Sequence, residues 1–148
     1  MKETPIEKVP EAWTAIADNR VKLVEGYGQD SGSAIIESSD GDKAYTVTWR
    51  EGGQIFTSTD PATYWQGYPG YPVIAVLMLL GRLSYNKELA AKFAGVEWKR
   101  VNTKFRNDYS KALKYVEEER GIDAEAVISA STEVLNELKS LALILKRK

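Results

Sequence analysis

Aromatic side chains gather in a short segment that begins at residue 64. Residues 64–72 contain two glycines and two prolines, together with the rings of Tyr64, Trp65, Tyr68 and Tyr71. Glycine permits backbone shapes closed to other residues, and proline stiffens a turn. Rings held on such a turn can stack against a base, a sugar or another planar ligand. They can equally fill the junction between two packed layers. We take these four residues as a candidate small-ligand site.

Positive charge is concentrated in a second segment. Residues 82–115 carry nine basic and three acidic side chains, a net charge of +6, whereas residues 1–81 carry −5 and residues 116–148 carry −2. If residues 97–119 form one helix, four of its cations fall within an arc of about 80°. Such a stripe is typical of a surface that binds a phosphate backbone. The predicted nucleic-acid contacts are Lys99, Arg100, Lys104, Arg106, Lys111 and Lys114.

Two other patterns bear on this hypothesis. Amphipathic helices normally carry Lys and Arg on their solvated face, so the stripe also fits a surface without a partner. Residues 89–101 superficially resemble a helix-turn-helix, with small residues, a turn at Gly95 and then Val96 and Val101. The spacing before Gly95 is one residue too long, however, and the bulky Trp98 occupies the start of the second helix. An ordinary helical corner explains the segment equally well.

Composition excludes several enzyme classes. The chain has 0 Cys and 0 His, so it can form no disulfide, no thiolate or imidazole zinc site and no Ser-His or Cys-His catalytic pair. It has no phosphate-binding GxxxxGK[ST] motif either. We therefore predict no catalytic residue, no metal ligand and no cofactor, and we favour a binding protein over an enzyme.

The order of the expected helices and strands indicates how the aromatic and the basic segments are positioned in the fold. Pro10 and Trp13 fit a short N-terminal helix, and alternating apolar residues over 20–58, with Tyr27 among them, predict a four-stranded antiparallel meander. Asp60-Pro61 is a helix-start signal. Four helices are then expected, over residues 73–83, 87–94, 97–119 and from Asp123 to about residue 145, with cations from Lys146 to Lys148 at the end. Strands followed by helices predict a single α+β domain over residues 1–148, sheet-rich in 1–60 and helical in 61–148.

The last predicted helix has a wide apolar face. Either it lies centrally among the other helices, or it forms a homodimer interface. The residues of that interface would be Val134, Leu138, Leu141 and Leu145.

No targeting signal follows Met1, and the longest apolar run, residues 73–80, is too short to cross a membrane. The sequence thus predicts a non-catalytic cytoplasmic binding module without a membrane partner. Nucleic acid or another polyanion is its first candidate ligand. A small molecule bound, or turned over, at the aromatic segment and a homodimeric interaction protein are the alternatives.

Overall fold

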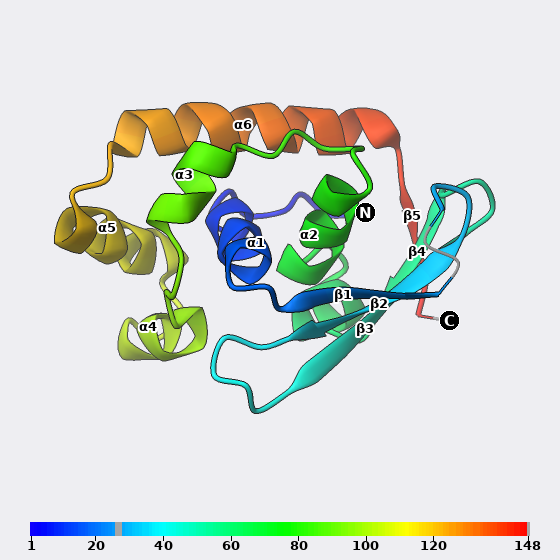
Figure 1. The fold of residues 1–148 in the computed structure, drawn as a ribbon, viewed down its shortest axis with the longest axis horizontal. Coiled ribbons are helices and arrows are strands. Elements are labelled where there is room, and N and C mark those ends of the chain that lie inside the picture. Colours follow the sequence, from blue (N-terminus) through cyan, green and yellow to red (C-terminus); the bar gives the residue numbers. More distant parts are fainter. Residues whose placement is uncertain (26–27, 148) are drawn as a thin grey trace.

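The computed structural model describes residues 1–25 and 28–147 of the chain. They form the predicted α+β architecture, with an N-terminal helix, an antiparallel meander and then helices (Figure 1). Tyr27 and Lys148, which the sequence assigns to the first strand segment and to the cationic end, lie outside the described residues. The elements are α1 (Lys8–Ala17), β1 (Val21–Glu25), β2 (Gly32–Glu37), β3 (Ala44–Arg50), β4 (Ile55–Ser58), the π-helix η1 (Ala62–Gln66), α2 (Tyr71–Leu79), α3 (Lys87–Lys92), α4 (Trp98–Lys104), α5 (Tyr109–Arg120), α6 (Ala124–Leu141) and β5 (Ile144–Leu145).

The sheet has the strand order β1-β2-β3-β4-β5, and its first four strands pair antiparallel. The fifth strand, which the sequence does not predict, pairs parallel with β4. The last helix was expected to reach about residue 145 but ends at Leu141, where Ala142 takes a left-handed φ of 49°. The side-chain amide of Gln54 donates to the carbonyls of Leu141 and Ala142, and this contact with the β3–β4 turn directs the chain into the sheet.

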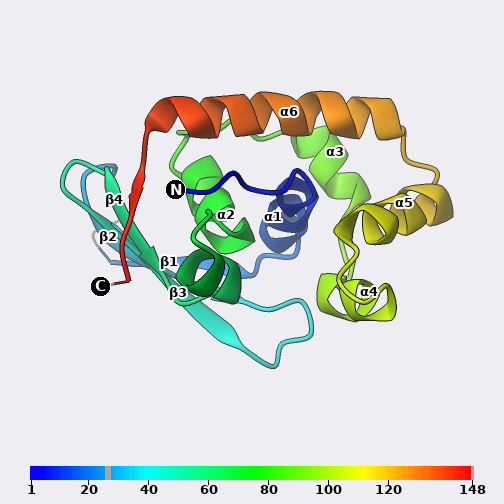
Figure 2. The same ribbon diagram turned by 180° about the vertical axis from the view of Figure 1, so that it is seen from behind.

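The helices cover one face of the sheet. Side chains on the inner face, among them Ile36, Val47 and Phe56, are fully buried. Helix α2 packs against β1, β3 and β4, and α1 packs beside α2. Figures 1 and 2 show α6 running along the opposite side of these two helices, away from the sheet. Helix α2 is apolar all round, in agreement with the burial of its residues 72–78.

The predicted single helix over residues 97–119 is wrong. The chain forms α4 and α5 instead, separated by Arg106 and Asn107, whose φ angles are +54° and +63°. Asn107 N–H donates to the carbonyl of Asn102 at 2.7 Å, which closes the turn. The Asp108 carboxylate then accepts from Lys111 N–H at 3.2 Å and caps α5. No Gly or Pro marks this break, so the residue pattern alone favours a continuous helix.

The positive φ of Arg106 leads to a prediction about the stability of the protein. Replacing Arg106 with glycine should raise the free energy of unfolding by about 0.5 to 1 kcal/mol, because glycine adopts a positive φ without the steric cost of a Cβ. Lys114→Gly, at an exposed position inside α5, is the matched control and should lose about 1 kcal/mol. Urea denaturation measures both. A loss of stability in Arg106→Gly would contradict the assignment of strain to this residue.

Helix α6 contributes to the core of its own chain. Val127, Val134 and Leu138 are 1%, 2% and 4% exposed, and Leu141 and Leu145 are half-buried. Its start agrees with the sequence, since the Asp123 carboxylate accepts from Glu125 N–H at 3.0 Å. Most of the apolar face that suggested a dimer is therefore covered within the chain. None of the described helices is both long and apolar enough to cross a membrane.

Candidate ligand-binding site

A cavity of about 420 Å³ lies where α1, the β2–β3 turn, η1 and α4 meet. Its wall also includes the first residues of α2 and α5, Tyr71 and Tyr109. This volume is in the range of small-molecule sites. Four cations, two carboxylates and four tyrosines belong to the lining, which is far more polar than the core of the fold.

A buried ion pair forms part of the wall. Lys8 and Glu11 lie one turn apart on α1, with Nζ and Oε2 3.2 Å apart and side chains only 8% and 6% exposed. The Lys8 ammonium also lies 4.0 Å from the centre of the Tyr109 ring. Burial raises the pKa of Glu11, although Lys8 and a hydrogen bond from Asn102 favour its charged form. Burial lowers the pKa of Lys8, but Glu11, Tyr109 and Tyr68 together outweigh it and the net change is upward.

Tyrosine hydroxyls supply further polar groups of the cavity wall. Tyr45, Tyr68, Tyr71 and Tyr109 all line the cavity, and the rings of Tyr45 and Tyr71 meet edge to face at 6.5 Å. Burial raises the pKa of Tyr45, Tyr68 and Tyr71 above the usual value of 10.0. The three hydroxyls are therefore protonated at neutral pH and available as hydrogen-bond donors.

The structure divides the four predicted aromatic residues into two pairs. Tyr68 and Tyr71 line the cavity, whereas Tyr64 and Trp65 do not. The latter pair packs with Arg147, whose guanidinium lies 5.2 Å and 5.5 Å from the two ring centres, and Trp65 is 67% exposed. The wide turn of the π-helix η1 separates the pairs, and Gly67 ends it with a φ of +79°. A five-residue π-helix is rare and frequently marks a functional site.

Asp60 holds the aromatic segment against the sheet. It is 3% exposed, and its carboxylate accepts from the Ser58 hydroxyl and, at 3.1 Å, from Thr63 N–H. The Thr63 hydroxyl in turn accepts from Gly70 N–H at 2.9 Å. Asp60 thus acts as the helix-start residue that the sequence predicts, and its carboxylate is fully engaged in the wall.

Arg20 also belongs to the lining of the cavity. Its Nη1 donates to the Glu37 carbonyl at 2.5 Å, which fixes the guanidinium at the end of β2. Its Nε is buried and has no hydrogen-bond partner among the described residues. The nearest carboxylate oxygen, on Asp18, lies 4.0 Å from Nε, beyond hydrogen-bond distance. A buried donor of this kind is expected to find a partner.

Two lysines stand at the rim of the cavity. Lys99 of α4 lies 3.2 Å from Asp40, and its backbone N–H donates to the Ser39 hydroxyl, so α4 is tied to the β2–β3 turn. The Ser38 hydroxyl, the Asp42 N–H and Lys99 together lower the pKa of Asp40 to about 2. Lys43 also lines the cavity, is exposed and has no ion-pair partner among the described residues.

The six predicted nucleic-acid contacts do not form a line along one helix, because α4 carries three of them and α5 carries two. Arg100 pairs with Glu97 at 3.4 Å, Lys111 pairs with Asp108 at 3.9 Å, and Lys99 pairs with Asp40. Lys104 lies 4.2 Å from the Tyr115 ring centre. Arg106 lies in the left-handed turn, and Lys114 is exposed on α5.

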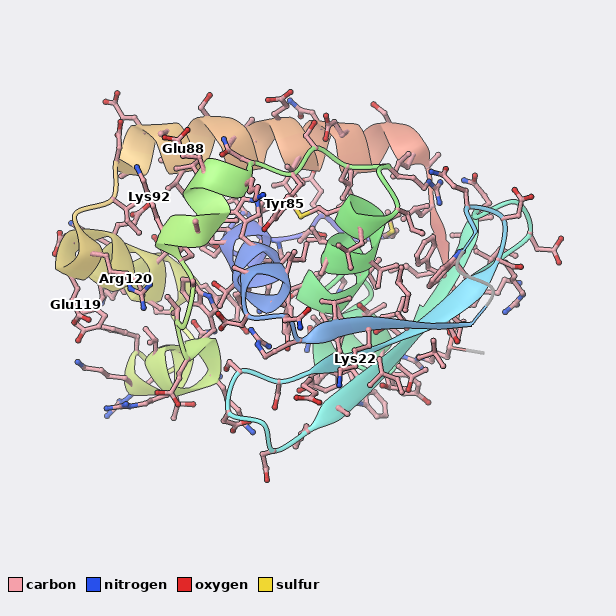
Figure 3. All side chains as sticks on the ribbon, in the orientation of Figure 1. Lys22, Tyr85, Glu88, Lys92, Glu119 and Arg120 are labelled. Carbon is pink, nitrogen blue, oxygen red and sulfur yellow. The ribbon has the colours of Figure 1, made fainter. Side chains whose placement is uncertain are left out.

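A second hollow, of about 450 Å³, lies between α4 and α5 and includes Arg100, Lys104 and Arg120 in its lining. Arg120 is already engaged there, since its Nη1 donates to the carbonyls of Lys92 at 3.0 Å and Ala94 at 2.6 Å. Figure 3 shows Lys92 and Arg120 on the neighbouring ends of α3 and α5. This contact joins α3 to α5, and the Arg120 guanidinium that makes it is already engaged with two carbonyl groups.

Sequence reasoning missed Lys8, Glu11, Arg20, Asn102 and Tyr109. Lys8 and Glu11 do carry a weak signal, because they stand next to Val9 and Ala12 in a helix that is buried from residue 8 to residue 15. Charged residues at helical spacing inside an apolar stretch are unusual and indicate a buried pair. Within the described part of the chain, no group of three or more metal-binding side chains is placed to hold a metal ion.

The fold and the cavity define an α+β protein whose helices and β2–β3 turn enclose a polar, tyrosine-lined site. The chain belongs to the family described as Uncharacterised conserved protein UCP014422, whose model matches residues 1–144. This range contains every residue that lines the cavity. No curated protein and no solved structure matches the chain.

Proposed function

We propose that the protein binds a small polar molecule in the tyrosine-lined cavity. The Lys8–Glu11 pair carries this proposal. Moving two charges out of water costs free energy that their attraction rarely recovers, and apolar residues of similar size serve stability equally well or better. An ion pair that is buried yet faces a cavity is therefore better explained by a ligand that contacts it.

The surroundings of the pair support the same function. Several residues that carry hydrogen-bond donors belong to the lining of one space, namely the tyrosines and Arg20. The strained turn at Arg106 and Asn107 places Asn107 and Tyr109 on the wall, and strained backbone is concentrated at functional sites. A few convergent polar groups in a cavity of this size are typical of a binding site.

A retention experiment tests the proposal. The purified protein is incubated with an extract of small metabolites and washed by rapid gel filtration, and retained molecules are identified by mass spectrometry. We expect the wild type to retain a small polar molecule that the Lys8→Met/Glu11→Leu variant loses. That variant exchanges the ion pair for apolar side chains of similar size and should remain folded. Equal retention by both proteins, or none by the wild type, would contradict the proposal.

Nucleic-acid binding is a separate proposal, based on Lys104, Lys111 and the exposed Lys114. If it is correct, affinity for duplex or single-stranded probes falls steeply with salt, and Lys104→Glu/Lys111→Glu abolishes it. The same variant serves as the control for the retention experiment, because neither residue lines the cavity. Cytoplasmic location and homodimerisation are likewise proposals from the sequence, tested by cell fractionation and by mass measurement in solution.

A further inference from the structure

The polar groups that line the cavity differ in how many of their possible hydrogen bonds and ion pairs are formed. Both carboxylates are engaged, Glu11 by Lys8 and Asn102, and Asp60 by Ser58 and Thr63 N–H. On the donor side, Lys43 has no ion-pair partner and Arg20 Nε no acceptor among the described residues. Among the charged groups of the lining, the unused bonding capacity is therefore that of donors.

The charged side chains of the cavity lining are mostly positive. The lining contains four cations, Lys8, Arg20, Lys43 and Lys99, and two carboxylates. Outside the lining, Asp18 lies 4.0 Å from Arg20 and Asp40 lies 3.2 Å from Lys99, which leaves Lys43 as the unpaired charge among the described residues of the lining. A cationic ligand would have to lie beside these groups. The aromatic face and the carboxylate best placed to receive a cation are already occupied by the Lys8 ammonium, 4.0 Å from the Tyr109 ring centre and 3.2 Å from Glu11.

We infer that the ligand carries an oxyanion, a carboxylate or a phosphate, bound by the guanidinium of Arg20 together with tyrosine hydroxyls. This inference depends on the proposed function, since it names the ligand class of the same cavity. Guanidinium groups suit both oxyanions, because their N–H donors match the spacing of two oxygens. Lys43 and Lys99 at the rim attract the anion toward the cavity.

The neighbours of Arg20 hold it ready for this contact. Its Nη1 is anchored on the Glu37 carbonyl, and the Tyr71 hydroxyl is hydrogen-bonded to the same guanidinium. Little side-chain freedom is then lost when an anion binds, so more of the interaction energy contributes to affinity.

Four probes of similar size, each carrying one aromatic ring, test the inference on the intact protein: phenyl phosphate, benzoate, benzyl alcohol and benzyltrimethylammonium. Binding is measured by ¹H–¹⁵N NMR titration, with the indole N–H of Trp98 reporting on the cavity wall. We expect phenyl phosphate or benzoate to bind in the millimolar range, and the stronger of the two identifies the oxyanion. The neutral and cationic probes should bind much more weakly.

Charge-removing variants locate the anion. Arg20→Gln should weaken the binding of the better anionic probe about tenfold, because a charged hydrogen bond is lost. Lys43→Gln, at an exposed position that should not disturb folding, should weaken it by a smaller factor. Lys22→Gln removes the same charge from β1 at a residue outside the cavity lining (Figure 3) and should leave binding unchanged.

The outcomes separate the two proposals. Equal or tighter binding of benzyl alcohol or benzyltrimethylammonium at the cavity would overturn the oxyanion inference while leaving the cavity a binding site. Anion binding that is equally weakened by Lys22→Gln would show attraction to net charge alone and would also overturn it. If none of the four probes shifts the Trp98 signal, the oxyanion inference fails, and the retention experiment decides the proposed function independently.

Discussion

Replacing Glu11 with glutamine should lower the free energy of unfolding at pH 7 by about 3 to 5 kcal/mol, because Lys8 is left buried without its counter-charge. The size of this loss has a physical limit. Lys8 can release its proton instead of remaining charged, and its ordinary pKa of 10.5 is about 3.5 units above pH 7. At about 1.36 kcal/mol for each unit, deprotonation costs about 5 kcal/mol, so the loss should not exceed that value.

The pH dependence should change in a defined direction. In the wild type the pKa of Lys8 is higher in the folded chain than its usual 10.5, so the folded state holds this proton more tightly. The stability contributed by the charge of Lys8 is therefore full below pH 10.5 and falls as the pH rises through the folded-state pKa. In Glu11→Gln this decline disappears. Stability should instead increase as the pH approaches 10.5, because the unpaired Lys8 loses its proton more readily in the folded state.

Two variants serve as controls for this prediction. Lys8→Met/Glu11→Leu removes both charges and should match or exceed the wild type in urea denaturation. Glu3→Gln breaks an ion pair with Lys139, 3.5 Å apart, in which both side chains are largely exposed, and should change stability by less than about 1 kcal/mol. If Glu11→Gln were as mild as Glu3→Gln, the buried pair would not be the coupled unit that the structure indicates.

Replacing Gly70 with alanine should cost about 3 kcal/mol and disturb the cavity at the same time. A Cβ at this position would overlap the Asp60 Oδ2 atom and approach the Ala62 side chain to 3.1 Å. Asp60 has little room to move, since it is buried and bonded to Ser58 and Thr63. The predicted loss combines the cost of overpacking with that of a broken buried hydrogen bond.

A double-mutant cycle checks this mechanism. Asp60→Ala removes the obstructing carboxylate, so Gly70→Ala should cost much less in the Asp60→Ala background than in the wild type. Gly28→Ala is the matched control, because a Cβ there meets no atom within 4 Å, and should lie within about 0.5 kcal/mol of the wild type. Equal costs of Gly70→Ala in both backgrounds would mean that Asp60 is not the obstacle.

Local signals predict most of the elements correctly. The meander follows from alternating residues and from turns rich in Gly, Asp and Ser. The start of α6 follows from Asp123, and Gly121, with a φ of +65°, ends α5 as expected. In each case the determining residues lie within a few positions of the boundary, which is why the sequence alone is sufficient.

The features that sequence reasoning missed depend on distant partners. The helix break at Arg106 and Asn107 has no Gly or Pro to mark it, and β5 is a strand only because β4 accepts it. The same applies to the site. Lys8 and Glu11 belong to the wall because Asn102 and Tyr109, more than 90 residues later, pack beside them. A helical pattern identifies which residues share a face but not which distant element that face will meet.

The pairing of β4 with β5 has a consequence for synthesis of the chain. Gln54 bonds to Leu141, 87 residues further on, so the open edge of β4 has no strand beside it until residues 144–145 have left the ribosome. Contacts this far apart in sequence are slow to form, and an uncovered strand edge is a template for pairing with other chains. During translation this edge is therefore open to pairing with other chains until residues 144–145 cover it.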